Sequence, residues 1–246
     1  MPTHPYELVE DTRPRLGLVV LQADETVEDD FRRLFSPDEV CLHITRIPSG
    51  AALNPETIRD MEAALPAAAA LMPEAVRFDA VGYGCTSGST LIGAHRVRAL
   101  VQAGCRTEAV TDPLTAAFAA FSSLNCTRVG IVSPYIASVS EALRRAFEAH
   151  GFEVPRVVSF GEEIEANVAR IAPTSIRSAA ESLVGGSALD GVFLSCTNLR
   201  TLGVLDDLQR ALGLPVLSSN LALAWHLAEH SGAPLGISLS APRHQW

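Results

Sequence analysis

The sequence has few of the features that mark nucleic-acid or membrane-binding proteins. Its 246 residues include 19 Lys and Arg against 28 Asp and Glu, for a formal net charge of −9. Nucleic acids and anionic membranes are bound through clustered positive charge, and the basic residues here form no cluster. No run of about 18 apolar residues could cross a bilayer, and the N-terminus lacks the basic and apolar segments of a secretory signal. We therefore expect a cytoplasmic protein that binds neither nucleic acid nor membrane.

Cysteine and metal-site patterns are also scarce. The five cysteines are an odd number without CxxC spacing, which fits neither a disulfide framework nor a zinc site. His226 and His230 stand four apart but lack the glutamate of an HExxH motif, so no metal is expected. The glycine-rich stretch 82–88 has neither the lysine of a P-loop nor the GxGxxG pattern, which argues against a phosphate-binding loop.

What the chain does contain is a repeated succession of strand-like and helix-like segments. The continuous apolar run at 16–21 is typical of a buried parallel strand. Segment 40–47 alternates like a strand, and the run 78–83 and the short segment 107–110 are also interpreted as strands. Segments 27–34, 55–71, 86 to about 103, and about 221–230 are typical of helices. With 48% hydrophobic residues, the chain can bury a substantial core.

The second half of the chain resembles the first, which indicates an internal duplication. Gly17 aligns with Gly130, and Cys85 aligns with Cys196 at nearly the same offset. Each half reads as alternating strands and helices, which predicts an α/β fold of two pseudo-symmetric lobes, each a parallel sheet flanked by helices. Ligands bind at the carboxyl ends of such strands, so the active site is expected in the cleft between the lobes. The predicted division is an N-terminal arm 1–14, a first lobe 15–118 plus 221–246, and a second lobe 119–220.

Each lobe ends one strand in a Cys-Thr pair, and both Cys85 and Cys196 are expected at strand-to-helix turns. A thiol at a strand-to-helix turn meets unpaired backbone N–H groups and the positive end of the helix dipole, so Cys85 is expected to be a thiolate. The hydroxyls of Thr86, Ser87 and Thr197 could hold a carboxylate and stabilise an enediolate. Two thiols facing one α-carbon could racemise it without a cofactor. The other three cysteines are interpreted as packing residues: Cys41, Cys105 and Cys126.

These motifs resemble a known superfamily. Residues 84–89 (GCTSGS) and 195–198 (SCTN) are similar to those of the aspartate/glutamate racemases. Residues 133–136 (SPYI), with the repeat layout, resemble the maleate cis-trans isomerase and arylmalonate decarboxylase branch. The loop 22–26 and residues 195–201 look most like racemase-like proteins associated with ectoine utilisation.

The resemblance implies roles for particular residues. Cys85 and Cys196 would be the catalytic pair, and no metal or organic cofactor would be used. The residues implied to contact the substrate carboxylate or its enediolate are Thr86, Ser87 and Tyr135, to which we add Thr197 and Asn198 beside the second cysteine. A homo-oligomer, dimer or tetramer, is also implied.

Departures from the branch bear on the substrate. Maleate isomerases resemble this chain but place an asparagine where Asp24 aligns, and an anionic Asp24 would attract an ammonium group and repel a second carboxylate. Residues 161–165 (GEEIE) could add negative charge or form a solvated loop. Asp24 could also orient or deprotonate Cys85. We expect a cofactor-independent racemase or epimerase acting on a small carboxylate, an amino acid.

Three alternatives stay open. Maleate cis-trans isomerisation would proceed through a covalent cysteine adduct. Arylmalonate-type decarboxylation is less consistent with the chain, because decarboxylases that resemble it carry one cysteine, with glycine at the position of Cys85. A non-catalytic ligand-binding protein could use the same two-lobed shell.

Overall fold

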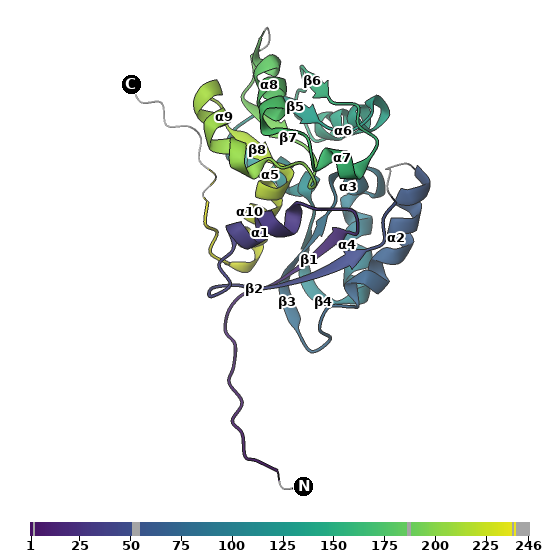
Figure 1. Ribbon diagram of the computed structural model, residues 1–246, viewed down its shortest axis with the longest axis vertical. Helices are drawn as coiled ribbons and strands as arrows, with labels where there is room; N and C mark the ends of the chain where they lie inside the picture. The colour runs from purple at the N-terminus through teal and green to yellow at the C-terminus, as the bar shows by residue number, and fades with distance from the viewer. Residues whose placement is uncertain (2, 51–54, 186–187, 238, 240–246) are drawn as a thin grey trace.

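The computed structural model of the chain describes residues 1, 3–50, 55–185, 188–237 and 239. These residues form two four-stranded parallel sheets, in the orders β2-β1-β3-β4 and β6-β5-β7-β8 (Figure 1). The first sheet consists of β1 (Arg15–Leu21), β2 (Cys41–Ile47), β3 (Arg77–Gly84) and β4 (Arg106–Thr111); the second consists of β5 (Val129–Ser133), β6 (Val157–Ser159), β7 (Gly191–Leu194) and β8 (Val216–Ser218). The same strand order in both halves confirms the predicted two-lobed α/β fold.

Helices cover both faces of the first sheet. They are α1 (Val27–Leu34), α2 (Pro55–Ala69), α3 (Thr86–Ile92) and α4 (Ala94–Gly104). One face carries a core formed with α2 and α4, which includes Met61, Phe78 and Val101. The opposite face packs against α1 through Leu18 and Phe31. A parallel sheet buried on both faces requires near-continuous apolar strands, which is the pattern that β1 shows.

The second sheet has its own layers of helices. Its helical elements are α5 (Pro113–Ser123), α6 (Ala137–Ala149), α7 (Glu165–Val168), α8 (Pro173–Val184), the 3-10 turn η1 (Leu202–Val204) and α9 (Leu205–Leu212). On one face, rings from α5 and α6 meet the sheet, with the centroid of Phe193 lying 6.2 Å from Phe121 and 5.3 Å from Phe147. The other face receives Leu183 of α8, which lies close to Gly130.

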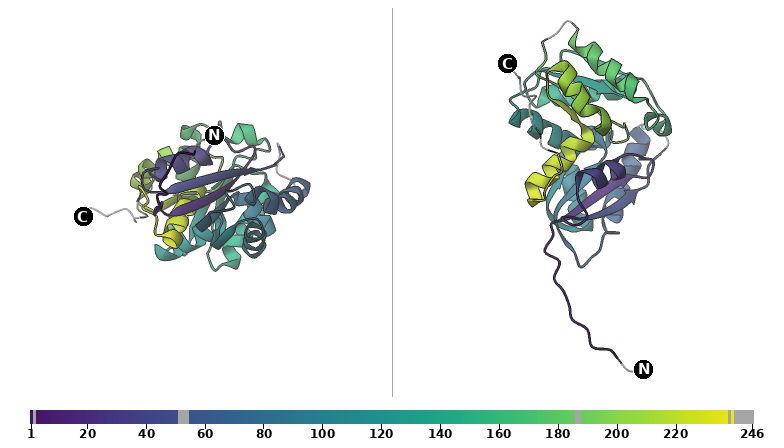
Figure 2. Two further views of the ribbon diagram at one scale, coloured as in Figure 1. Left: turned by 90° about the horizontal axis from the view of Figure 1, so that it is seen from below. Right: turned by 60° about the vertical axis from the view of Figure 1, so that its left-hand side comes forward.

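The last helix of each half packs on the sheet of the other. α5 ends the first half and packs on the second sheet through Phe121. α10 (Ser219–Ser231) ends the second half and returns to the first sheet, where Leu223 and Leu227 lie against Gly82. The yellow α10 lies at the junction of the lobes (Figure 2). The two lobes therefore share a core.

The matched glycines of the repeat have a common packing role. A Cβ atom at Gly17 would come within 2.8 Å of the Met72 sulfur, and one at Gly130 would come within 2.8 Å of Leu189. Both distances are below van der Waals contact, so a larger residue would push neighbouring side chains away. The alignment of these glycines thus reflects one constraint repeated in two sheets.

Two sequence-based predictions about elements were wrong. The single helix expected from 86 to about 103 is two helices, because Gly93 adopts φ 87° and ends α3. Cys196 does not lie at a strand-to-helix turn. A loop separates the end of β7 at Leu194 from η1. Within the described residues, no helix is long and apolar enough to span a bilayer.

Candidate active site

The two cysteines of the repeat follow equivalent strands. Cys85 comes directly after β3, and Cys196 lies two residues beyond the end of β7. β3 and β7 occupy the same position in their sheets, next to the fourth strand of each order. Both residues are buried, with exposed fractions of 2% and 4%. Each lobe thus contributes one enclosed thiol from the carboxyl end of its strands.

Cys85 is the N-cap of α3. Its sulfur accepts a hydrogen bond from the Gly88 N–H at 3.2 Å and lies 3.5 Å from the Ser87 hydroxyl oxygen. The Tyr83 hydroxyl borders the same space, because a Cβ atom at Gly88 would fall within 2.5 Å of that hydroxyl and 3.0 Å of the Cys85 sulfur. The absence of a side chain at residue 88 therefore lets the thiol reach the first turn of the helix.

Cys196 has an unusual backbone conformation. Its φ is 102°, a region that residues other than glycine rarely adopt. This conformation aims its N–H at the Ser219 hydroxyl, 3.0 Å away, and its thiol is hydrogen-bonded by the Tyr135 hydroxyl. Strained backbone conformations cost about 1–3 kcal/mol and cluster at functional sites. The contacts with Ser219 and Tyr135 hold the second thiol in place without a helix.

The structure contradicts the expectation that Cys85 is a thiolate. Burial raises the pKa of Cys85 from 9.0 to about 11, and this effect outweighs the hydrogen bonds from Ser87 and Gly88. Burial, with the nearby charge of Glu165, raises the pKa of Cys196 well above its ordinary value. The prediction failed because desolvation of the charged form exceeds the attraction of one helix terminus. Both thiols are protonated in this closed form.

Two buried carboxyl groups lie beside the thiols. One oxygen of Asp24 accepts hydrogen bonds of 2.8 Å from the N–H groups of Thr26 and Val27, while its other oxygen has no partner among the described residues. Glu165 is 5% exposed and accepts a hydrogen bond from Asn198 at 3.1 Å. Burial raises the pKa of both carboxyl groups. The charge of Asp24 raises the pKa of Cys196, which associates this carboxyl group with the second thiol rather than with Cys85.

Residues from the two lobes are joined across the site. The Thr86 hydroxyl donates to Ser219 at 2.8 Å, and the Thr197 hydroxyl donates to the Gly84 carbonyl at 3.3 Å. Asn198 accepts from the Glu25 N–H at 2.8 Å. At the rim, Glu25 also pairs with Arg170 at 2.9 Å. These bonds hold the lobes closed around the thiols.

The residues predicted from the sequence lie together in this site. All eight are buried: Asp24, Cys85, Thr86, Ser87, Tyr135, Cys196, Thr197 and Asn198. Sequence reasoning placed Glu165 only in a charged segment, in which Glu162 is half-buried and Glu163 is exposed. It assigned no substrate contact to Ser219 or Tyr83. The available signal for Tyr83 was its position at the end of the predicted strand 78–83.

Comparisons with known proteins find a matching family model and similar relatives. The family model described as arylmalonate decarboxylase matches residues 86–238. A maleate isomerase of Nocardia farcinica is 26% identical over 91% of this chain and 92% of its own. An arylmalonate decarboxylase of Bordetella bronchiseptica is 32% identical over about half of each chain, 50% and 51%.

Solved structures show the same fold. A cysteine-to-serine mutant of the Nocardia farcinica maleate cis-trans isomerase, with a covalently bound succinylcysteine intermediate, has a TM-score of 0.82 at 23% identity, covering 91% of this chain and 95% of that one. The maleate isomerase Iso of Pseudomonas putida S16 has the same TM-score at 19% identity, covering 92% and 96%. Together with the family model and the relatives, these structures confirm the resemblance to the maleate isomerase and arylmalonate decarboxylase branch, and they do not show the ectoine-utilisation subgroup.

Proposed function

The chain belongs to the arylmalonate decarboxylase family, and from that premise we propose that it is a cofactor-independent isomerase in which Cys85 and Cys196 act on a small carboxylate. The observation that carries the proposal is the pair of buried thiols, one from each lobe, that have Tyr135 and Glu165 as common neighbours. Decarboxylation requires one proton donor for the carbanion that it leaves. Two thiols supply both the base and the acid that inversion of a carbon centre requires.

The first step is the loss of a proton from one thiol. Glu165 is a suitable acceptor, because its raised pKa makes it a stronger base than an exposed carboxylate. The resulting thiolate removes the α-proton of the substrate, and the electron pair of that C–H bond moves into the substrate carboxylate to form an enediolate. The hydroxyl groups of Thr86 and Tyr135 would hold its oxygens.

The second thiol completes the reaction. It gives its proton to the opposite face of the α-carbon, so the configuration inverts and the carboxylate is restored. The two cysteines have then exchanged protonation states, and the reverse reaction can begin from the other side. No electrons enter or leave the substrate, so the chemistry needs no redox partner.

We infer that the substrate is an amino acid. Asp24 and Glu165 bring two carboxyl groups into one buried site, where charges interact more strongly than in water. An ammonium group would be attracted by both, whereas the second carboxylate of a diacid would be repelled. An amino group would also offer a hydrogen-bond donor to the unpartnered oxygen of Asp24. An amino-acid substrate fits the predicted likeness to proteins of ectoine utilisation.

A second candidate is cis-trans isomerisation of a C4 diacid. It is favoured by the two maleate isomerases of similar length and fold. One thiolate would add to a carbon of the double bond, and the electron pair would move into the adjacent carboxylate. Rotation about the new single bond and loss of the thiolate would then give the trans product. The negative charge of Asp24 and Glu165 opposes this reaction.

Proton NMR in D2O separates the candidates. The protein is incubated with a panel of amino acids and, separately, with maleate. Racemisation replaces the α-proton by deuterium and removes its signal, whereas isomerisation moves the vinyl signal of maleate to that of fumarate. Turnover of maleate without exchange at the α-carbon of any amino acid would reject the amino-acid proposal and leave the two-cysteine isomerase standing.

A further inference from the structure

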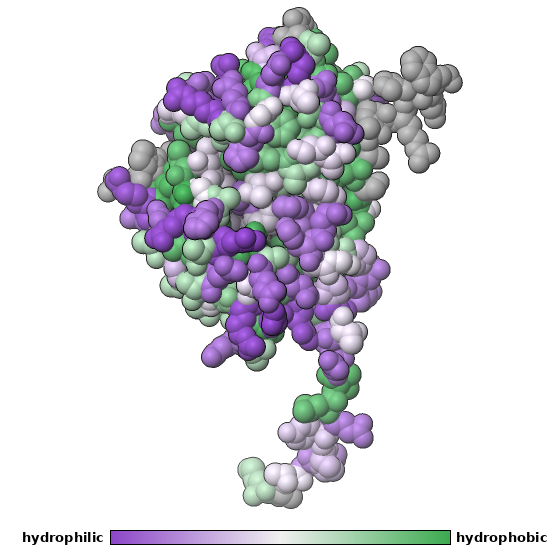
Figure 3. All heavy atoms as spheres, turned by 180° about the vertical axis from the view of Figure 1, so that it is seen from behind, coloured by the Kyte–Doolittle hydropathy of each residue, from purple (hydrophilic) through white to green (hydrophobic). Residues whose placement is uncertain are grey.

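An N-terminal segment remains outside the proposed chemistry. Residues 3–12, here called the arm, form no helix or strand. Tyr6, Leu8 and Val9 on the arm are 83%, 89% and 93% exposed. The arm leaves the body of the molecule as an extended strip (Figure 1), and Figure 3 shows apolar surface along it. Apolar side chains that lie so close together and so fully exposed are typical of a segment that binds another surface.

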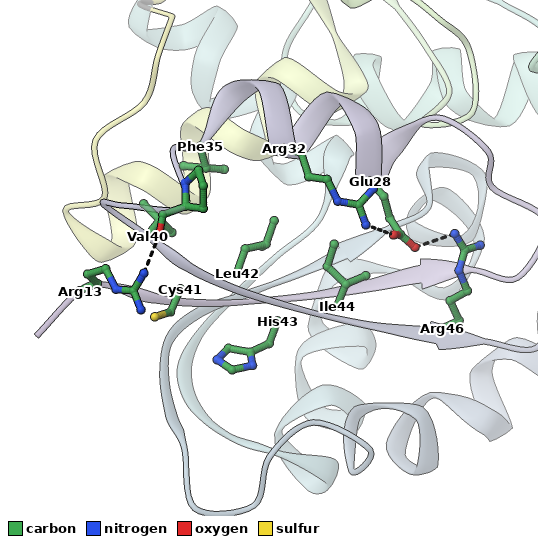
Figure 4. Close-up of a pocket in the computed structure, with 11 residues that line it drawn as sticks. Arg13, Glu28, Arg32, Phe35, Val40, Cys41, Leu42, His43, Ile44 and Arg46 are labelled. Atoms are coloured by element: carbon green, nitrogen blue, oxygen red, sulfur yellow. Dashed lines mark hydrogen bonds and ion pairs between the residues drawn. The ribbon is translucent and has the colours of Figure 1, made fainter. Parts of the chain in front are cut away.

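A groove opens next to the base of the arm. It lies between α1 and the outer strand β2 and has a volume of about 860 Å³. Leu42 and Ile44 of β2 point toward α1 inside it (Figure 4). β2 ends the order of its sheet, so its outer edge pairs with no described strand. An edge strand beside apolar side chains can accept an added strand.

The arm and the groove have opposite charges. Three arginines line the groove with one glutamate, and Glu28 bonds to Arg32 at 2.8 Å and to Arg46 at 2.6 Å. The groove is thus positive in a chain whose net charge is −9. The arm carries Glu7 and Glu10 near its exposed apolar residues. Complementary charge of this kind steers association and sets orientation.

The base of the arm is fixed in a way that directs the arm outward. Arg13 donates to the Pro37 carbonyl and pairs with Asp11 at 2.7 Å. Cys41 at the start of β2 donates its N–H to the Pro14 carbonyl at 2.9 Å. These contacts hold the base of the arm at the end of the groove while the rest of the arm extends away from it. At about 3.3 Å per residue, the arm reaches roughly 30 Å from its base, far enough to contact a second molecule.

We propose that the arm of one copy binds in the groove of a second copy, and that the second arm returns the contact. The arm adds a strand to the free edge of β2, with Tyr6 and Leu8 against Leu42 and Ile44. Its glutamates then lie near the groove arginines. Such a reciprocal contact has two-fold symmetry and closes on itself as a dimer. This inference does not depend on the reaction at the cysteines.

The oligomeric state of the full chain tests the proposal. Sedimentation equilibrium should give a dimer. Deletion of residues 1–10 should give a folded protein that is mainly monomeric, with dimer association weakened at least 100-fold. Leu8→Asp should have the same effect. The matched control is Leu71→Asp, which changes an exposed leucine away from the arm and the groove and should leave the dimer intact. A monomeric full chain, or a dimer that survives the deletion, would overturn the proposal.

Cross-linking identifies the contact itself. A photoreactive phenylalanine analogue at residue 6, in a mixture of isotopically light and heavy protein, should join light to heavy chains at residues 41–46. Cross-links confined to one chain would mean that the arm folds back on its own groove. Cross-links elsewhere on the partner would place the dimer contact outside the groove. Either result refutes arm exchange.

Discussion

The charge of Glu165 should control the reactivity of both thiols, and Glu165→Gln tests this directly. The substitution keeps the shape of the side chain and an oxygen that can accept the Asn198 hydrogen bond of 3.1 Å. It removes a buried negative charge that raises the pKa of Cys85 and of Cys196. Both thiols should therefore ionise more readily in the variant.

The expected change in the alkylation rate follows from the pKa of Cys85. A pKa of about 11 instead of 9.0 lowers the thiolate fraction at neutral pH roughly 100-fold, because each pKa unit is a factor of ten. Burial is the larger cause and is unchanged in the variant. Removal of the Glu165 charge should thus recover part of the difference, about a 3- to 10-fold faster alkylation of Cys85 at pH 8.

The assay is iodoacetamide labelling, with each cysteine peptide quantified by mass spectrometry. Glu163→Gln is the matched control, because it removes an exposed charge two residues away. Glu165→Gln should also raise the KM for the amino-acid substrate about 10-fold, and diacids should bind to this variant more tightly. Equal labelling rates at Cys85 in the two variants would refute the electrostatic role of Glu165.

Three further predictions concern packing, stability and closure. Gly88→Ala should lower kcat at least 100-fold without unfolding, because its methyl group would fall 3.0 Å from the Cys85 sulfur. In the control Gly203→Ala the methyl group meets no atom within 4 Å, so kcat should be unchanged. Burial raises the pKa of Asp30 from 3.8 to about 6. Above pH 6 the ionised carboxylate therefore lowers the free energy of unfolding by about 2–3 kcal/mol. This loss of stability disappears as the pH falls toward 3.8. Asp30→Asn should accordingly raise the melting temperature at pH 8 but not at pH 4 in calorimetry, and an equal shift at both values would refute the argument. Arg170→Met removes the rim ion pair with Glu25 and should speed labelling of Cys85 and Cys196 a few-fold by favouring the open form, with no change at Cys105.

The fold was predictable because it depends on patterns repeated along the chain. The apolar runs, together with the matched Gly17 and Gly130, predict two equivalent parallel sheets. The break at Gly93 was not predicted, because an isolated glycine in a helical segment is compatible with either a continuous or an ended helix. Only its φ of 87° decides between them.

The sequence predicted which residues form the candidate site better than it predicted the pKa values of the thiols. The repeat singled out Cys85 and Cys196, but the sequence could not show that both would be desolvated, since burial depends on how the lobes close. Glu165 was hidden for the same reason, because it stands in an acidic segment in which Glu163 is exposed and Glu162 is half-buried. Its burial follows from the Asn198 contact across 33 residues of sequence.

Deuterium incorporation by the two single-cysteine variants tests the central claim most directly. The wild-type chain, Cys85→Ser and Cys196→Ser are each incubated in D2O with either enantiomer of an amino acid that the wild type turns over, and the α-proton and the enantiomeric ratio are followed together. The two-thiol mechanism predicts exchange with inversion in the wild type and loss of inversion in both variants. Inversion that persists in either variant at a rate near that of the wild type would contradict it.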